Sequence, residues 1–337
     1  MAKPHIVIVG AGALGCLFGA GFCGAGYGVT LVTRTPESAA LLQQNGIRID
    51  SDNKTRTVTG FVATADYASV RDASVVVILV KSSATAAVAK ALAPHLTPNT
   101  LVLTLQNGLG NVEALTAHIP VSRVAVGITG NGAALLGTGY IRFGGITETV
   151  LGEQGGGPSM RLDAVRDIFV KAGFPTRVSE TITSAVWTKL MVNVGLNPVS
   201  ALTGLRNGDI IKETEAFALA EAAVREAATV AAALGIRLDV DDPVAHTHRA
   251  ASLTAVNETS MLQDLRAGRL TEIEAMNGQI ELHAKALGIP VPVNTTLASL
   301  IRLQQKRRSE AVDKGPSGAA PPPQTPPLGG SSPWTPQ

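Results

Sequence analysis

Cysteine is nearly absent from this sequence, and its scarcity limits where the protein can work. The chain has two cysteines, Cys16 and Cys23. If the segment between them is helical, their Cα atoms lie about 10 Å apart, which is too far for a disulfide. A secreted protein held together by disulfides is therefore excluded, and the reducing cytoplasm is the expected location.

An excess of either charge is also missing. The chain has 28 Lys and Arg against 26 Asp and Glu, which gives a formal net charge of +2. Nucleic-acid binders carry a clear basic excess, so this balance argues against a nucleic-acid partner. Hydrophobic residues make up 45% of the 337 residues, which is enough apolar material for a large core. At about 150 residues per domain, the length suggests two domains.

Charge is absent altogether between Ile6 and Thr33. An uncharged run of this length could cross a bilayer, or serve as a signal peptide because Lys3 precedes it. However, eight of its residues are glycines, in a pattern that a membrane anchor does not need. We therefore expect no membrane segment.

The order of apolar runs predicts an α/β protein with an N-terminal Rossmann domain and a C-terminal all-helical domain. Strand-like runs alternate with helical stretches up to about residue 178, as in a parallel sheet that is covered on both faces. Long Ala-, Leu- and Glu-rich segments follow and predict helices. We expect domains at 1–178 and 179–312, and a disordered Pro-rich tail at 313–337. The helices are expected at Lys212–Leu234, Pro243–Leu265 and Thr271–Leu287.

The most informative motif is Gly10-Ala11-Gly12-Ala13-Leu14-Gly15. It follows an apolar strand and opens a stretch compatible with a helix, which is the context that the dinucleotide-binding fingerprint requires. The first glycine permits the tight turn, the second lets the backbone approach the pyrophosphate, and the third lets the helix pack on the sheet. A glycine-rich buried helix is the structural alternative.

The residue at the end of the second strand selects the cofactor. NAD enzymes place Asp or Glu there to bind the ribose 2′-hydroxyl, whereas this chain has Arg34 and no acid before Glu37. A guanidinium matches the 2′-phosphate of NADP in charge and in geometry. The sequence therefore predicts NADPH/NADP as the cofactor, with a solvated surface arginine as the alternative.

Two later strands are followed by polar loops, which carry Lys81 and Asn107. Ligands of parallel sheets bind at the carboxyl ends of the strands. Lys81 could reach a phosphate or ribose, and Asn107 offers an amide donor and an acceptor. Taken alone, each could equally well be an ordinary turn residue.

In the helical half, three polar residues interrupt an apolar helix at a spacing of four: Lys189, Asn193 and Asn197. This spacing puts them on one stripe of the helix. The stripe could be the solvated face, but the apolar residues around it favour a narrow polar seam. A partly buried lysine has a lowered pKa, which suits a general acid near neutral pH.

A second polar group contains Ser260 and Asp264, one helical turn apart, and then Glu272. Thr271 and Glu274 fit a helix-capping box, and Glu272 could also be an acid favoured at a helix N-terminus. The pair His246 and His248 has no clustered acid or cysteine, so we expect no metal site.

Together these residues resemble the ketopantoate reductase (2-dehydropantoate 2-reductase) family over about residues 5–310. The resemblance rests on the order and spacing of Gly10–Gly15, Gln106-Asn107-Gly108, Trp187–Asn193 with Asn197-Pro198, and Ser260–Asp264 followed by Glu272. It implies a Rossmann domain and a helical domain with the active site between them. It also implies NADPH-dependent reduction of ketopantoate to pantoate, in pantothenate and coenzyme A synthesis.

The resemblance also implies roles for individual residues. Lys189 would be the general acid, and Glu272 the active-site acid near the cofactor. Asn107 would bridge nicotinamide and substrate, Ala133 would contact NADP through its backbone, and Arg34 and Lys81 would hold NADP phosphate. The implied substrate contacts are Lys189, Asn193, Asn197, Asn207 and Ser260.

Two other functions stay open at this stage. One is reduction of another branched 2-oxo acid, because the family contains paralogues with these motifs. The other is a non-catalytic NADPH sensor, which would not need a lysine and several amides along one seam. The sequence does not decide the oligomeric state and leaves a homodimer open. The Pro-rich tail has no counterpart in the family.

Overall fold

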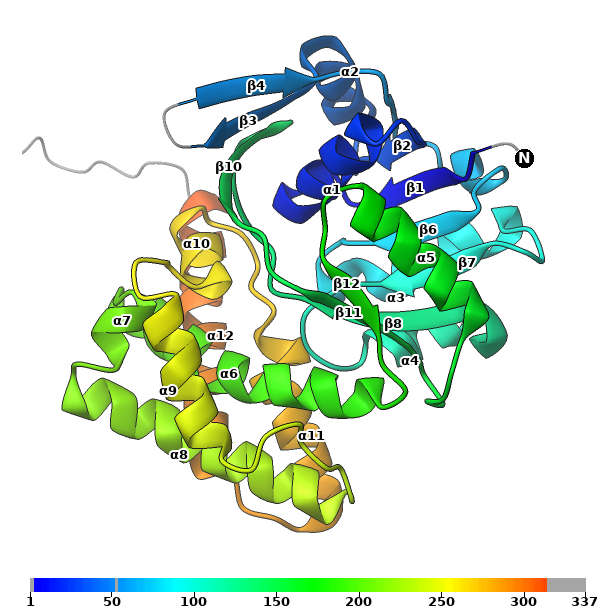
Figure 1. Ribbon diagram of the computed structural model, residues 1–337. Helices are drawn as coiled ribbons and strands as arrows, with labels where there is room; N and C mark the ends of the chain where they lie inside the picture. The colour runs from blue at the N-terminus through cyan, green and yellow to red at the C-terminus, as the bar shows by residue number, and fades with distance from the viewer. Residues whose placement is uncertain (1–2, 52–53, 314–337) are drawn as a thin grey trace, which may run out of the picture.

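The computed structural model describes residues 3–51 and 54–313. The predicted disordered tail, 313–337, lies outside the described residues except for Asp313, the last residue of helix α12. Within the described part, a sheet with its helices is followed by a layer of helices alone (Figure 1).

The first part is built on an eight-stranded sheet in the order β12-β11-β8-β7-β6-β1-β2-β5. Neighbouring strands from β5 through to β8 run parallel, whereas β11 is antiparallel to β8. The strands are β1 (His5–Val9), β2 (Gly28–Val32), β5 (Val62–Thr64), β6 (Val75–Ile78), β7 (Leu101–Thr104), β8 (Val124–Thr129), β11 (Thr149–Glu153) and β12 (Thr176–Val178).

Helices bury both faces of this sheet. Along β1, Ile6 and Ile8 point into one apolar cluster, and Val7 and Val9 point into another. This alternation follows from the two-residue period of a strand. The first cluster includes side chains of α1 (Ala13–Gly24) and α5 (Met160–Lys171), and the second includes those of α3 (Thr85–Leu92) and α4 (Asn111–Thr116). A further helix, α2 (Pro36–Asn45), follows β2.

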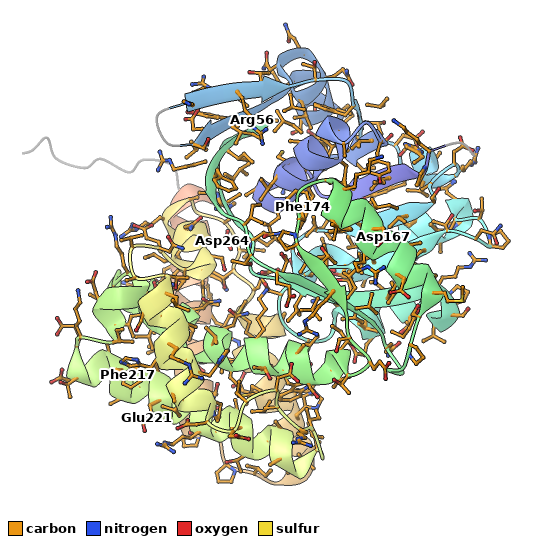
Figure 2. The ribbon with its side chains drawn as sticks, viewed as in Figure 1. Arg56, Asp167, Phe174, Phe217, Glu221 and Asp264 are labelled. Carbon is orange, nitrogen blue, oxygen red and sulfur yellow. The ribbon has the colours of Figure 1, made fainter. Side chains whose placement is uncertain are left out.

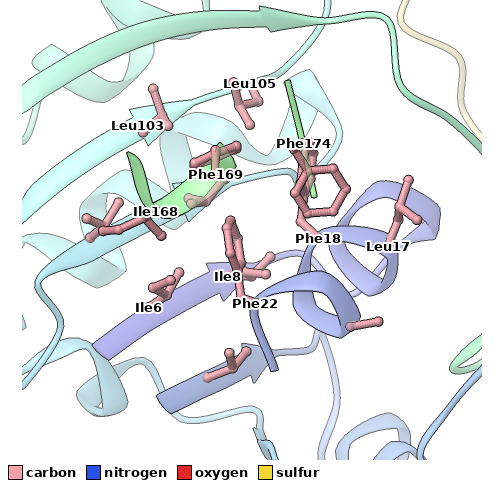
Figure 3. Packing of buried hydrophobic residues seen from close by; sticks show 14 of the residues in the cluster. Ile6, Ile8, Leu17, Phe18, Phe22, Leu103, Leu105, Ile168, Phe169 and Phe174 are labelled. Atoms are coloured by element: carbon pink, nitrogen blue, oxygen red, sulfur yellow. The ribbon is translucent and has the colours of Figure 1, made fainter. Parts of the chain in front are cut away.

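Within the first cluster, four phenylalanines pack against one another: Phe18, Phe22, Phe169 and Phe174. Their ring centroids lie 4.6–6.4 Å apart, mostly edge to face (Figure 3). Such aromatic pairs contribute about 0.5–1.5 kcal/mol beyond their burial. Gly21 makes room for them, because a Cβ there would lie 2.4 Å from the ring of Phe174. This packing fixes α1 and α5 to each other.

A smaller sheet in the order β4-β3-β10-β9 was not fully predicted from the sequence. Its strands are β3 (Ile47–Ser51), β4 (Lys54–Val58), β9 (Gly132–Gly137) and β10 (Tyr140–Gly145). Only β10 was expected. The missed strands have Thr, Arg, Gly or Ala in place of a continuous apolar run, and all residues of β4 are at least partly exposed. Pairing between distant segments, not local pattern, makes them strands.

In the second part, the described residues after Val178 form helices and the loops between them, and no strand. Its helices are α6 (Ile182–Thr203), α7 (Asn207–Ile210), α8 (Thr214–Ala233), α9 (Pro243–Leu253), α10 (Ser260–Arg266), α11 (Asn277–Leu287) and α12 (Pro292–Asp313). The buried side chains of α6, α8, α10, α11 and α12 form its main core. The fold class is the one predicted. The exact domain boundary at residues 178 and 179 stays a prediction.

Two helix predictions were wrong in their extent. The helix expected over Pro243–Leu265 is two helices, α9 and α10, and Thr259 caps the second by accepting from the Leu262 N–H. The helix expected from Thr271 begins at Asn277 and follows a single 3₁₀ turn, η5 (Ile273–Ala275). The predicted capping box is also absent.

The capping box fails because its two members find other partners. The Thr271 hydroxyl accepts from the Ile273 N–H. The Glu274 carboxylate accepts two hydrogen bonds from Arg302 on α12, both 2.7 Å long. An ion pair across two elements has displaced the local cap, which sequence spacing cannot reveal.

Candidate functional site between the sheet and the helices

The glycine-rich turn between β1 and α1 has the geometry that a dinucleotide needs. Gly10 has a φ of +112°, and a Cβ there would lie 2.6 Å from the Leu79 backbone. A Cβ at Gly15 would lie 2.0 Å from the Gly10 carbonyl oxygen, so this helix touches the turn directly. By contrast, a Cβ at Gly12 would have no neighbour within 4 Å among the described residues. Two glycines therefore serve close packing, and the third leaves an open backbone.

The same turn forms the N-terminus of α1. Gly12 is the N-cap residue and makes no side-chain cap. The first N–H groups of a helix have no partner within the helix and attract anions. Ala11 lies in this turn, and Ala13 and Leu14 are the first two residues of α1. Their main chain, and not their side chains, is the part that a phosphate can contact. The turn fits the pyrophosphate of a dinucleotide.

Arg34 lies two residues beyond the end of β2 and is exposed. Within the described part of the chain it makes no hydrogen bond or ion pair. Its neighbour Thr35 caps α2 by accepting from the Ser38 N–H at 3.2 Å. The guanidinium is therefore free beside a helix N-terminus, an arrangement that suits a phosphate.

Lys81 follows β6 and contacts the helical part of the chain. Its ammonium pairs with the buried carboxylate of Asp264 on α10 and lies 4.0 Å from the carboxylate of Glu272. Asp264 also accepts a 2.9 Å hydrogen bond from Arg269. Figure 2 labels Asp264 on α10. The sequence placed Lys81 near a phosphate, but the link to Asp264 joins residues 183 positions apart and has no local signal.

Glu272 is buried and joins the loops that follow two neighbouring strands. Its carboxylate accepts from the Ser82 N–H at 3.3 Å and, at 3.5 Å, from the Asn107 amide. The loop after β7 is itself braced, because Gln106 donates to the Val80 carbonyl at 2.8 Å. Glu272 therefore reaches from the helical part to the carboxyl edge of the sheet.

Lys189 on α6 is half-buried and is held by the sheet. Its ammonium donates to Asn107 Oδ1 at 2.8 Å and to the Thr129 carbonyl at 2.6 Å, at the ends of β7 and β8. Burial lowers the pKa of Lys189 to about 8, and the negative charge of Glu272 opposes that shift. Thr129 was not predicted, because it acts through its backbone, which no residue type reveals.

A cavity of about 530 Å³ lies next to Lys189. Asn197 in its wall is buried and donates to the sulfur of Met276 at 3.3 Å. Asn207 donates to Thr254 at 2.8 Å, but its Oδ1 has no partner among the described residues. The wall includes five of the predicted substrate residues: Lys189, Asn193, Asn197, Asn207 and Ser260.

The structure thus brings together residues from four separate motifs. Two predicted residues, Ala133 and Arg34, lie apart from them. Asn107 and Glu272 do not line the cavity, but Asn107 accepts a hydrogen bond from Lys189 in its wall, and the charge of Glu272 acts on the same lysine. Ala133 on β9 pairs with Phe143 and packs on the sheet core. Arg34 lies beyond β2, away from the cavity wall. The predicted role of Ala133 and Arg34 in binding the cofactor stays a prediction.

A larger cavity, of about 1030 Å³, lies at the amino ends of the strands, beside His5, Val75 and Leu101. None of the predicted site residues lines it. Ligands of such sheets bind at the carboxyl ends, so size alone does not identify the site.

The described residues contain no group of three or more His, Cys, Asp or Glu side chains placed to hold a metal ion. Among the described helices, none combines the length and apolar character needed to cross a membrane.

Comparison with known proteins gives matches along nearly the whole described chain. Residues 6–156 match the family model described as ketopantoate reductase PanE/ApbA, and residues 181–305 match its C-terminal counterpart. A 2-dehydropantoate 2-reductase of Halobacterium salinarum is 38% identical over 90% of this chain and 99% of its own length. One from Archaeoglobus fulgidus is 33% identical over 90% of this chain and 98% of its own.

Solved structures agree with this. A crystal structure of a PanE/ApbA family ketopantoate reductase from Ralstonia eutropha JMP134 has a TM-score of 0.82 and 32% identity, covering 90% of this chain and 99% of that one. D-mandelate dehydrogenase with NADH and anilino(oxo)acetate has a TM-score of 0.84 at 24% identity, with the same coverage, and shares the fold. This chain belongs to the ketopantoate reductase PanE/ApbA family.

Proposed function

We propose that this protein reduces ketopantoate (2-dehydropantoate) to pantoate with NADPH. Family membership supports this, since the relatives named 2-dehydropantoate 2-reductase match this chain over nearly their whole length. The observation that carries the proposal is the placement of Lys189. A half-buried ammonium is held by Asn107 at the sheet edge, in the wall of a cavity lined with amides. This arrangement supports the reduction of a 2-oxo acid, because a proton donor and polar groups for the substrate lie together.

A nicotinamide dinucleotide is the cofactor that the sheet side fits. The main chain of the turn over residues 10–15 would hold its pyrophosphate, with Lys81, Asn107, Ala133 and Glu272 further along the site. We propose NADPH in preference to NADH because Arg34 follows β2, is exposed, and has no partner among the described residues, so that it is free to pair with a 2′-phosphate. Charge-assisted hydrogen bonds to a phosphate contribute about 1.5–3 kcal/mol.

When bound, a reduced nicotinamide would supply the hydride for the 2-oxo carbon. Negative charge then develops on the substrate oxygen, and Lys189 stabilises this charge as an ammonium and donates a proton to it. A pKa of about 8 keeps most Lys189 protonated at neutral pH and makes its proton easier to transfer than that of an ordinary lysine. Asn107 and the Thr129 carbonyl hold the ammonium in place. The negative charge of Glu272 favours the protonated form of Lys189.

The other cavity residues would bind the rest of the substrate. Asn193 and Asn197 lie on the same stripe of α6 as Lys189 and could hold the hydroxyl and carbonyl groups. Ser260 is exposed at the start of α10 and could bind the carboxylate. The Oδ1 of Asn207 has no partner in the part of the chain that the structure describes, and a substrate hydroxyl would satisfy this acceptor.

The decisive experiment follows NADPH oxidation with ketopantoate beside a panel of other branched and aromatic 2-oxo acids. We expect the highest kcat/KM with ketopantoate and NADPH. A higher value for another 2-oxo acid would reassign the substrate. Tight NADPH binding without turnover of any member would instead favour a sensor.

We place the protein in the cytoplasm, since both cysteines are free thiols and its substrate is a small metabolite. We divide it into an NADP-binding domain at 1–178 and a substrate domain at 179–312, because the last strand ends at Val178 and α6 begins at Ile182.

A further inference from the structure

Helix α6 carries the proposed catalytic lysine and two substrate amides, and it contains a proline. Pro198 lies inside the helix, immediately after Asn197. Proline has no N–H, so the carbonyl four residues earlier, that of Val194, loses its helical partner. This gap falls between Asn193 and Asn197, in the middle of the polar stripe.

A side chain from another helix supplies the missing hydrogen-bond donor. Asn277, the first residue of α11, is completely buried and donates its Nδ2 to the Val194 carbonyl at 3.1 Å. The same Nδ2 donates to Asn294 Oδ1 at 2.9 Å. Both partners are acceptors, so the amide cannot be turned around without facing oxygen to oxygen. The donor at this carbonyl is therefore specified.

Asn277 is in turn anchored through the core. Asn294 donates to the Ala223 carbonyl at 2.9 Å and to the Glu226 carboxylate at 2.8 Å. Glu226 on α8 also accepts the Val293 and Asn294 N–H groups at 2.9 Å each, and so caps the start of α12. The chain of bonds from Glu226 to Asn294 to Asn277 thus ends on α6 at the proline gap.

Two further contacts connect this point to the cavity. The residue before Asn277 is Met276, whose sulfur accepts the amide of Asn197 at 3.3 Å. Gly195 lets α8 approach at the same level, because a Cβ there would lie 2.9 Å from Val224. The direction of α6 on both sides of the gap is therefore set by α11 and α8 and not by the helix alone.

We propose that Asn277 is a positioning residue for the reaction: it replaces the hydrogen bond that Pro198 removes, and so fixes Lys189 and Asn193 relative to Asn197. It touches neither substrate nor cofactor. A substrate held across both halves of α6 requires their relative position to within a fraction of an ångström. This inference rests on the proposed function, because it concerns residues assigned to ketopantoate binding and reduction.

The test uses the proline itself. Replacing Asn277 by Leu removes the donor while keeping similar volume, and we expect kcat/KM for ketopantoate to fall at least tenfold, with the affinity for NADPH unchanged. Pro198→Ala restores a main-chain N–H opposite Val194. We expect Pro198→Ala alone to stay within about threefold of wild type, and the double variant to recover most of the loss.

A matched control separates positioning from general loss of stability. Asn294→Ala removes one partner of Asn277 and the link to Glu226 but leaves a donor at Val194. We expect this variant to lower the melting temperature while kcat/KM, measured well below that temperature, changes much less than in Asn277→Leu. Pro198→Ala should not relieve the loss of stability that Asn294→Ala causes.

The outcomes are distinct. If the folded double variant is no more active than Asn277→Leu, the inference is wrong, because restoring the bond has not restored the site. If Asn277→Leu folds only together with Pro198→Ala, that contrast supports it. If neither folds, the same cycle is run with Asn277→Ser, whose short side chain cannot span the distance. Absence of ketopantoate turnover in the wild type would overturn the proposed function instead.

Discussion

The two sides of the site are built from different materials. On the sheet side, the turn after β1 offers main-chain N–H groups, and its glycines matter because they lack side chains. On the helical side, α6 offers a lysine and two amides, and these matter because of their side chains. Backbone suits a phosphate shared by all dinucleotides. Side chains suit a substrate that differs from one enzyme to the next.

The two sides also differ in how far apart in the sequence the residues that shape them lie. The turn is made within one short segment, since Gly15 packs on Gly10. Lys189 acquires its environment from Asn107 and Thr129, which are 82 and 60 residues away in the chain. Changes on the sheet side should therefore act on cofactor binding, and changes on the helical side on turnover.

The largest effect is expected from Lys189→Ala. Loss of the proton donor should reduce kcat with ketopantoate by about 10²–10⁴-fold, while NADPH still binds. Turnover measured together with an NADPH titration tests this. Lys285→Ala, an exposed lysine on α11, is the matched control and should behave as wild type. Near-normal turnover of a folded Lys189→Ala variant would remove the proposed mechanism.

Next come two glycine substitutions that distinguish packing from ligand approach. Gly15→Ala forces a Cβ against the Gly10 carbonyl, and overpacking of this kind costs about 1–3 kcal/mol of stability. We expect a lower melting temperature and weaker NADPH binding. Gly12→Ala meets open space, so the melting temperature should hold while NADPH binding weakens. Equal melting temperatures for the two variants would contradict this division of roles.

A smaller and more selective change is expected for Arg34→Asp. Loss of the phosphate partner should weaken NADPH by roughly 10- to 100-fold, corresponding to about 1.5–3 kcal/mol, and leave NADH nearly unchanged. The melting temperature should not move, since the side chain is exposed. Titration with both cofactors provides the control within one variant. A wild type that binds the two equally would refute the assignment of Arg34.

The mildest perturbation is pH. Lys189 donates a proton only when it is protonated, and burial lowers its pKa in the folded protein to about 8. We therefore expect kcat/KM to be level near neutral pH and to fall as pH rises through about 8, approaching tenfold per unit. NADPH affinity over the same range is the control. A profile that stays level up to the ordinary lysine pKa, about 10.4, would show that burial does not tune this group.

How much the sequence could predict follows from the same contrast. The glycine turn and the stripe on α6 were visible because each is periodic or contiguous, and the structure places both at the carboxyl edge of the sheet. The break between α9 and α10 was missed because Thr259 starts a new helix inside a stretch of continuous helical pattern. The ion pair of Lys81 with Asp264 and the bond from Asn277 to Val194 link distant segments. No local pattern encodes them.

One contact between the two parts needs no side-chain chemistry at all. The Leu109 N–H donates to the Ala275 carbonyl at 2.8 Å, and Gly108 comes so close that a Cβ would lie 2.2 Å from that oxygen. A bond between main-chain atoms survives replacement of Leu109 or Ala275 by most other residues. During evolution, residues of the cavity wall near Lys189 can therefore be replaced one by one while this main-chain bond is kept. Gly108 is the exception, and we expect it to tolerate the fewest replacements.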